Sequence, residues 1–281
     1  MVADRGVVRQ SRPLRWRATA RPADLDELRA AKRGRRISAV LPARNEGPTV
    51  GAIVAAIVAL DPLVDEVVVV DDGSTDATAA EASGAGATVV AAGPSGPGKG
   101  HAMWRGLAHT GGDIVVFCDA DLEAFDAGFV TGLVAPLLND ERLCFVKAAY
   151  RRSLAGRDGE GGRVNELVAR PLLALLFPEL AWIAQPLGGE CAGRRVVLEQ
   201  VAFVSGWGVD LALLVDIARR CGAGAIAQVD LGERHHRNRP LRELAPQAAE
   251  VLRTALSRAS AVGVEPPGSC PPLGYDRTLS P

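Results

Sequence analysis

Two groups of closely spaced carboxylates are the residues of this chain best suited to chemistry. Asp119-Ala120-Asp121 follows the apolar stretch Ile114–Cys118, and Asp71-Asp72-Gly73-Ser74-Thr75-Asp76 follows the apolar stretch Glu66–Val70. Hard divalent cations prefer carboxylate oxygens, and a nucleoside diphosphate completes their coordination. Because a lone Asp-x-Asp also occurs in ordinary solvated turns, its interpretation depends on the segments that lie beside it.

A third polar segment, Leu41-Pro42-Ala43-Arg44-Asn45-Glu46, ends another apolar run. The elements that position these segments follow from apolar periodicity and from capping and turn residues. They are strands over Ile37–Pro42, Glu66–Val70, Thr88–Ala92, Ile114–Cys118 and Ala225–Leu231, and helices over Ala23–Lys32, Thr49–Leu60, Lys99–His109, Asn165–Leu176 and Val209–Arg220. A further helix is expected after Gly73-Ser74-Thr75-Asp76, capped by the hydroxyl side chains.

Strands that alternate with helices at this pace predict an α/β fold with a parallel sheet and right-handed crossovers. Ligands bind at the carboxyl ends of the strands in such sheets, where all three polar segments fall. The alternation breaks after Tyr150. We therefore expect a basic arm over residues 1–36, a first half over 37–150, a second half over 151–258 and a loose tail over 259–281.

The composition of the chain argues against several classes of function. The net charge of −1, from 32 basic and 33 acidic residues, argues against a nucleic-acid binder. The longest apolar run, Val50 to Leu60, is shorter than the roughly 18 residues of a membrane span, and we expect no leader peptide. Five scattered cysteines without a Cys-x-x-Cys pair predict a reduced, cytoplasmic protein with free thiols and no structural zinc.

Lys99 is one of three lysines in the chain and follows the Gly- and Pro-rich loop Gly93–Gly98 at a predicted helix start. Glycine permits close approach of an anion, the helix N-terminus favours negative charge, and the ammonium adds to both effects. The spacing is not that of a Walker A loop. An exposed lysine without a partner is the alternative interpretation.

Together the three polar segments resemble the nucleotide-sugar half of GT-A glycosyltransferases. Four further segments make the chain similar to the glucosyl-3-phosphoglycerate synthase family and its mannosyl-3-phosphoglycerate synthase relatives: Pro97-Gly98-Lys99-Gly100, Gly161 to Pro171, Gln185 to Glu190, and His236 to Pro240. The resemblance runs from about Ser38 to Leu241. It implies a Rossmann-like, mostly parallel sheet with helices on both faces and a smaller C-terminal part that binds the acceptor.

The resemblance also implies a donor site and a metal site. The residues implied to bind the nucleotide sugar are Pro42, Ala43, Arg44, Glu46, Asp72, Lys99, Asp119, Ala120, Leu187, Gly188 and Asp210. Asp121 and His236 are implied to hold Mg²⁺ or Mn²⁺, and Asp210 and Lys99 to act at the reacting sugar. From the residues alone, His236 could be a surface histidine and Asp210 an acidic side chain at a helix N-terminus.

The acceptor site implied by the resemblance comprises Gly162, Arg163, Val164, Asn165 and Asn238. In the family this segment binds 3-phosphoglycerate, and an Arg fork beside helix amides suits that anion. The chain departs from the family pattern at three positions. Asn165 stands where Thr is usual, Asp210 where Glu is usual, and His101 where an acidic residue is usual.

We therefore expect a metal-dependent, retaining transfer of a sugar from a UDP- or GDP-linked donor to a small acceptor, with 3-phosphoglycerate favoured. No protein general base is needed, because the leaving phosphate oxygen can take the acceptor proton. The resemblance further suggests a homodimer.

Three other functions stay open. One is an actinobacterial specialised-metabolite transferase, for example one that joins a GDP-octose to the thiol of ergothioneine. Another is a sugar-1-phosphate nucleotidyltransferase, which needs a Gly- and Arg-rich loop where this chain has Pro42–Glu46. The last is a non-catalytic protein on the same fold, against which the intact Asp119-Ala120-Asp121 and His236 argue.

Overall fold

The computed structural model of the chain describes residues 16–19, 24–93, 98–154, 157–158, 162–234, 241–259 and 269–270. Within them, nine strands form one sheet in the order β1-β10-β6-β8-β5-β2-β3-β4, with β7 paired to β6. Its strands are β1 (Trp16–Thr19), β2 (Ile37–Ala43), β3 (Glu66–Asp71), β4 (Thr88–Ala91), β5 (Ile114–Phe117), β6 (Phe145–Leu154), β7 (Arg157–Asp158), β8 (Cys191–Arg194) and β10 (Ile226–Arg234). A separate pair joins β9 (Phe203–Val204) to β11 (Ser269–Cys270).

Most neighbours in the sheet are parallel, whereas β8 runs antiparallel to both β5 and β6. The carboxyl ends of β2, β3 and β5 therefore meet at one edge, as the sequence predicts. The expected α/β class and mostly parallel sheet are confirmed.

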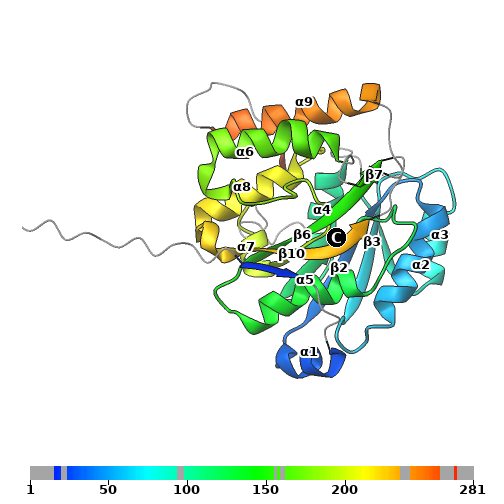
Figure 1. Cartoon of the computed structure of the whole chain (residues 1–281). Coiled ribbons are helices and arrows are strands. Elements are labelled where there is room, and N and C mark those ends of the chain that lie inside the picture. Colours follow the sequence, from blue (N-terminus) through cyan, green and yellow to red (C-terminus); the bar gives the residue numbers. More distant parts are fainter. Residues whose placement is uncertain are drawn as a thin grey trace, which may run out of the picture.

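Helices cover both faces of the sheet (Figure 1). Side chains of α1 (Leu25–Lys32), α2 (Gly47–Val58), α3 (Thr78–Gly84) and α5 (Gly128–Asn139) share one buried cluster with the sheet. A second cluster unites the other face with α4 (Lys99–Ala108), α6 (Arg170–Leu176), α7 (Arg195–Leu198), α8 (Val209–Cys221) and α9 (Leu241–Arg258). Single turns lie at Asn165–Ala169 (η1), Pro178–Leu180 (η2) and Ala223–Ala225 (η3).

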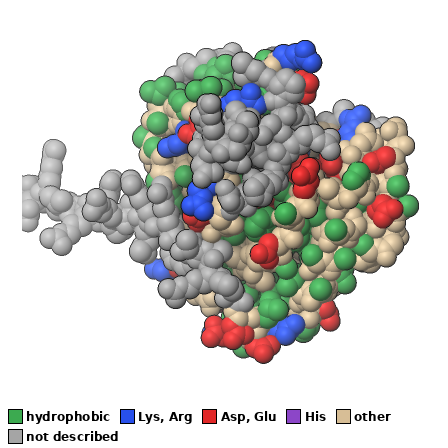
Figure 2. Space-filling model, turned by 45° about the vertical axis from the view of Figure 1, so that its right-hand side comes forward, with side chains coloured by type: hydrophobic (Ala, Val, Ile, Leu, Met, Phe, Trp, Pro, Cys, Tyr) green, Lys and Arg blue, Asp and Glu red, His purple; other side chains and the backbone are tan. Residues whose placement is uncertain are grey.

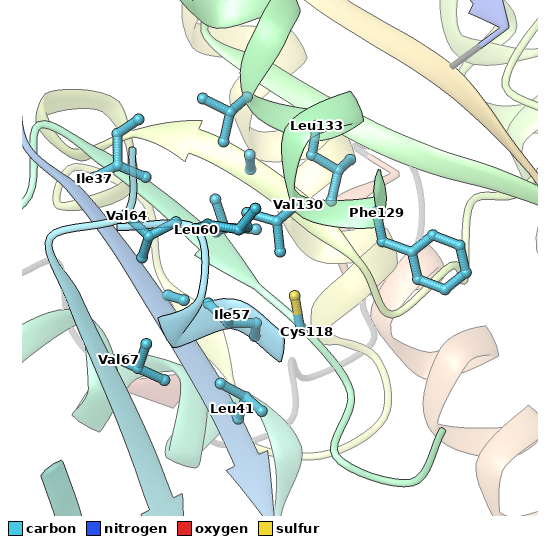
Figure 3. Close-up of a cluster of buried hydrophobic side chains, with 14 of the residues drawn as sticks. Ile37, Leu41, Ile57, Leu60, Val64, Val67, Cys118, Phe129, Val130 and Leu133 are labelled. Carbon is cyan, nitrogen blue, oxygen red and sulfur yellow. The ribbon is translucent and has the colours of Figure 1, made fainter. Parts of the chain in front are cut away.

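The first cluster anchors one of the predicted chemical segments. Figure 3 shows Ile57 of α2 and Val130 of α5 packed with Leu41 of β2 in this cluster. Cys118 belongs to the same cluster and is 1% exposed. Because Cys118 immediately precedes Asp119, the packed core fixes the point at which the Asp-x-Asp segment leaves the sheet.

The predicted helix at Ala23–Lys32 is confirmed as α1, which begins after Asp24 because the carboxylate of Asp24 accepts a 2.9 Å hydrogen bond from the Asp26 N–H. Strand β1 is not predicted from the sequence. It lies inside the basic arm and runs parallel to β10, with Trp16 opposite Ala227. A four-residue strand whose partner is so distant in the sequence carries too little local pattern to be recognised.

The predicted helix Asn165–Leu176 divides into two parts. Residues Asn165–Ala169 form a π-helical turn, and α6 begins at Arg170. Pro171 explains the change, since its ring has no N–H to donate and crowds the preceding turn of a regular α-helix. Wider π turns often lie at functional sites.

Charged and apolar side chains are interspersed on the face in Figure 2, over the part that is coloured by type. Within the described ranges, no helix has both the length and the apolar composition needed to cross a membrane.

Candidate functional site

Hydrogen bonds join the ends of the three strands that carry the polar segments. The N–H of Asp72 donates to the carbonyl oxygen of Ala43 at 2.9 Å, which links β3 to β2. The hydroxyl of Thr49 donates to the carbonyl oxygen of Ala120 at 2.6 Å, which links α2 to the segment after β5. The predicted meeting of the segments at one sheet edge is confirmed by these bonds.

The turn after β3 is hydrogen-bonded to Asn45, which lies after β2. Asn45, with a φ of 57°, accepts a 2.8 Å hydrogen bond from the N–H of Thr75 and donates its own N–H to Ser74 Oγ at 2.9 Å. The expectation that these hydroxyl side chains cap the next helix is therefore wrong. Asp76 supplies that bond instead, because its carboxylate accepts from the N–H of Thr78 at 3.0 Å, and the Thr78 hydroxyl lowers the pKa of Asp76.

The sheet edge opens into a pocket of about 510 Å³. Nine of the residues predicted for the nucleotide and metal line it: Pro42, Ala43, Arg44, Glu46, Asp72, Lys99, Asp119, Ala120 and Asp121. They come from three strand ends and from the start of α4, segments that are far apart in the sequence. A volume of this size is typical of a site for a small molecule.

The start of α4 differs from the expectation of free helix amides. The N–H groups of Gly100 and His101 both donate to the carbonyl oxygen of Ser205, at 2.9 and 3.3 Å, and the N–H of Gly98 donates to Asp72 at 2.9 Å. A Cβ on Gly100 would overlap the carbonyl of Val204. These amides already have partners within the protein, so the expectation that they bind an anion is wrong. The Lys99 ammonium and the Arg44 guanidinium are the cations that line the pocket.

Lys99 lies between two carboxylates. Its Nζ is 2.9 Å from Asp119 Oδ1 and 3.2 Å from Asp210 Oδ2, and its side chain is 13% exposed. Burial by itself would lower the pKa of Lys99, but Asp119, Asp210 and the buried Glu190 raise the pKa well above its ordinary value. Lys99 is therefore a fixed cation at the wall of the pocket, and the interpretation as an exposed, partnerless lysine is wrong.

Asp210 is held from its other side as well. It stands in the first turn of α8, its side chain is 5% exposed, and its Oδ1 is 2.5 Å from Nζ of Lys147. The chain of ion pairs Asp119–Lys99–Asp210–Lys147 thus connects the pocket to strand β6. Lys147 belongs to no sequence motif, and only the rarity of lysine in this chain draws attention to it.

The backbone at Gly189 lies against Asp119. A Cβ on Gly189 would overlap the Asp119 carboxylate, so only glycine leaves room for it. The N–H of Gly189 donates to the hydroxyl of Tyr150 at 3.2 Å, and the N–H of Gly188 donates to Gln185 O at 3.2 Å. The predicted donor-sugar segment therefore adjoins the predicted nucleotide carboxylate, although Leu187 and Gly188 do not line the described pocket.

Asn165 is buried, with 2% exposure, and its side-chain amide bonds within the protein. Its Nδ2 donates to the carbonyl oxygen of Ala184 at 3.1 Å and to Glu166 Oε1 at 3.0 Å, and its Oδ1 accepts from the N–H of Leu187 at 3.2 Å. The sequence-based expectation placed this amide on the acceptor. In the structure it holds the segment 184–187 that leads to the predicted donor-sugar residues.

The remaining acceptor residues lie near the π-helical turn. Gly162 has a φ of 73° and its carbonyl oxygen accepts from the N–H of Glu166, which places Arg163 and the buried Val164 at the start of that turn. None of them lines the described pocket. His236 and Asn238 lie outside the described residues.

The charges of the pocket fit a bound cation. Five carboxylates line it, from Glu46, Asp72, Asp119, Asp121 and Glu250, against two cations, from Arg44 and Lys99. A diphosphate is itself anionic, so it needs added positive charge to bind there. Among the described residues, no three His, Cys, Asp or Glu side chains converge on a metal position.

Sequence reasoning missed the far wall of the pocket. Gly206, Trp207 and Glu250 line it, although Glu250 lies on α9. The Glu250 carboxylate accepts from the N–H of Trp207 at 2.7 Å and lies against Gly206. These residues carry no motif, and only the packing of α9 onto this loop brings them to the site.

Comparisons with known proteins agree with this geometry. Residues 38–201 match the glycosyl transferase family 2. The chain is 53% identical over 247 residues to a glucosyl-3-phosphoglycerate synthase of Mycolicibacterium paratuberculosis, covering 83% of this chain and 75% of that protein. It is 42% identical over 242 residues to the enzyme of the same name from Petrotoga mobilis, with coverage of 81% and 74%.

Solved structures are similar over nearly the whole chain. One is the glucosyl-3-phosphoglycerate synthase of Mycobacterium tuberculosis with Mn²⁺, UDP-glucose and phosphoglyceric acid, at a TM-score of 0.84 and 46% identity, covering 92% of this chain and 98% of that one. Another is the same enzyme with Mg²⁺ and UDP, at a TM-score of 0.84 and 45% identity, with coverage of 93% and 99%.

Proposed function

Because the chain belongs to the glucosyl-3-phosphoglycerate synthase family of glycosyltransferases, we propose that it transfers glucose from UDP-glucose to 3-phosphoglycerate with Mg²⁺ or Mn²⁺. One observation carries the proposal. Nine of the residues that the resemblance assigns to the nucleotide sugar and the metal line a single pocket, and the ion-paired chain from Asp119 to Asp210 leads away from it.

Different pocket residues contact different parts of the donor. Pro42, Ala43, Arg44 and Glu46 surround the nucleoside, and Asp72 bonds to its base or ribose. Asp121 and His236 would hold the metal, which would supply positive charge to stabilise the diphosphate leaving group. Lys99 adds a fixed positive charge at the same end of the pocket.

The reaction exchanges one C–O bond for another at the anomeric carbon. The bond from this carbon to the UDP oxygen breaks, and the acceptor hydroxyl oxygen bonds to the carbon on the same face. The hydroxyl proton passes to the departing phosphate oxygen, so no protein base takes part. Asp210 orients hydroxyl groups of the sugar beside the reacting carbon, and the backbone at Leu187 and Gly188 contacts the sugar.

Arg163 is the residue we assign to the charged acceptor. A guanidinium can form two parallel bonds to a phosphate or carboxylate, and it stands beside Gly162 and Val164 at a helix start. Asn238 would complete the acceptor site. Asn165 contributes through the segment 184–187, which its amide holds.

A panel of donors and acceptors tests the proposed function. UDP-glucose, GDP-glucose and GDP-mannose are each combined with 3-phosphoglycerate or a small thiol, with Mg²⁺ or Mn²⁺, and release of nucleoside diphosphate is measured. We expect UDP-glucose with 3-phosphoglycerate to be the fastest pair. Activity with a thiol and none with 3-phosphoglycerate would instead favour the specialised-metabolite alternative, while no release with any pair would argue for a non-catalytic protein.

The assembly, the location and the division of the chain stay predictions. Leu167 and Leu175, which are 73% and 79% exposed on η1 and α6, support a homodimer that covers them. Light scattering on the native chain and on Leu175→Glu would test it. Four free thiols among the described cysteines fit the proposed cytoplasmic location. We keep the proposed division at 150, although β6 crosses this boundary.

A further inference from the structure

Lys147 is a cation enclosed by the core of the protein. Its side chain lies on β6 and is 0% exposed. Lysine is almost never fully buried without a partner, because the cost of removing its charge from water is large. Its position therefore needs a specific explanation, which the pocket does not supply, since Lys147 does not line it.

Asp210 is the one ion-pair partner of Lys147 within the described part of the chain. The Lys147 Nζ donates to Asp210 Oδ1 at 2.5 Å. Cys191 lies opposite Lys147 in the β6–β8 register. Burial raises the pKa of Cys191 to about 12, although Lys147 acts in the opposite direction. The thiol is thus neutral and leaves Asp210 to balance the charge.

The two lysines on Asp210 differ in what they can do. Lys99 lies at the pocket wall, bonds to Asp210 Oδ2 at 3.2 Å and also bonds to Asp119. A bound diphosphate can therefore compete for Lys99. Lys147 has no access to the pocket, and its bond to Oδ1 can persist when a donor binds.

We propose, on the basis of the function proposed above, that Lys147 is a positioning residue that holds the Asp210 carboxylate at the donor sugar. The strand that carries Lys147 belongs to the rigid sheet, whereas Asp210 stands in the first turn of a helix. A bond from the sheet to one oxygen fixes the carboxylate in both position and rotation. The second oxygen then faces Lys99, which lines the pocket in which we propose that the donor binds.

The first test is Lys147→Met, which keeps an unbranched side chain and removes the charge. Turnover should fall about tenfold to 100-fold, since ~1 Å of misplacement has such an effect. Affinity for UDP with Mn²⁺ should stay within about twofold of the parent, because UDP lacks the glucosyl group that Asp210 would orient. The gain in affinity from UDP to UDP-glucose, measured by calorimetry, should be lost.

A matched control is Lys32→Met. Lys32 also pairs with an aspartate, at 2.7 Å from Asp65 Oδ2, but it lies on α1 away from the pocket. This variant should keep parental turnover. A double variant, Lys147→Met with Asp210→Asn, removes both charges of the buried pair and serves if the single variant does not fold. If Lys147 acts through Asp210, the double variant should be within about twofold of Asp210→Asn alone.

Several results would overturn the proposal. One is parental turnover in Lys147→Met. Another is a loss of UDP affinity as large as the loss of turnover, which would indicate a general structural role. A third is a double variant whose loss equals the product of the two single losses.

Failure of the proposed function is distinguishable from these results, because the calorimetric comparison needs no acceptor. A parent that ignores 3-phosphoglycerate but binds one of the three donors still tests Lys147 by comparing that donor with its nucleoside diphosphate. A parent that binds none of the donors would overturn both proposals.

Discussion

The hydroxyl of Thr49 donates a hydrogen bond of 2.6 Å to the carbonyl oxygen of Ala120. Thr49 stands in the first turn of α2, and Ala120 lies between the carboxylates Asp119 and Asp121. The bond thus fixes the segment that carries both predicted nucleotide and metal groups to a helix packed on the sheet. It explains how a short loop can hold two carboxylates in a set direction.

Thr49→Val should loosen this segment without enlarging the core. The change keeps the side-chain shape and leaves the Ala120 carbonyl without its donor, a loss of roughly 1–3 kcal/mol for a buried group. We expect affinity for UDP with Mn²⁺ to fall about three- to tenfold, measured by calorimetry. Thr49→Ser keeps the hydroxyl and should bind like the parent. Equal affinities for the Val and Ser variants would show that the bond does not position the carboxylates.

Removal of the metal or of its predicted ligands should abolish turnover while the fold survives. Asp121→Ala and His236→Ala should each reduce turnover at least about 100-fold, because charge stabilisation by a metal is worth several kcal/mol. EDTA should have the same effect on the parent, and added Mn²⁺ should reverse it. Full turnover in EDTA would contradict the metal requirement, and a loss of the thermal transition in either variant would assign that residue to stability.

Much of the fold and one side of the pocket are predictable from the sequence, because their signals are local. Apolar runs mark β2, β3 and β5, and parallel strands must place their carboxyl ends together. Pro42 to Glu46 and Asp119 to Asp121 follow these strands directly, so their convergence needs no long-range information. Eight of the nine predicted residues that line the pocket belong to segments of this kind, and the ninth, Lys99, begins α4.

The remaining parts depend on contacts between distant segments. Glu250 reaches the pocket through the packing of α9, and Lys147 is defined only by its partner Asp210. Asn165 is instructive, because its residue type indicated a ligand-binding amide while its burial directs that amide to Ala184 and Leu187. A residue type states which bonds are possible, and only the packed structure determines which are made.

Arg163→Ala should weaken acceptor binding selectively. Removing one partner of a charged contact commonly costs about 2–5 kcal/mol, so the KM for 3-phosphoglycerate should rise strongly. The KM for UDP-glucose should change much less, since Arg163 does not line the pocket in which we propose that the nucleotide binds. Steady-state kinetics with each substrate varied in turn separates the two effects. A rise in donor KM equal to that of the acceptor would contradict this assignment.

Gly189→Ala should displace the carboxylate of Asp119. The added methyl group would overlap that carboxylate, which is also bonded to Lys99 at 2.9 Å. We expect turnover to fall about tenfold or more through misplacement of these groups. Gly84→Ala is the matched control, because no atom lies within 4 Å of the position its Cβ would take. Comparable turnover in both variants would show that Asp119 tolerates the displacement.

His101 should make stability fall at mildly acidic pH. His101 is 1% exposed, and its ring stacks on that of Trp104 with 5.9 Å between the ring centroids. Burial, together with Arg105, lowers the pKa of His101 below its ordinary value of 6.5, although Asp72 acts in the opposite direction. Above pH 6.5 the histidine is neutral in both the folded and the unfolded chain, so its full contribution to the stability of the fold is present. As the pH falls below 6.5 towards the lower folded-state pKa, only the unfolded chain takes up the proton, and stability is lost.

Denaturant unfolding at about pH 7.5 and about pH 5.5 should therefore show a smaller decrease in the free energy of unfolding for His101→Gln than for the parent. An equal decrease in both proteins would mean that His101 does not contribute to the acid sensitivity of the fold.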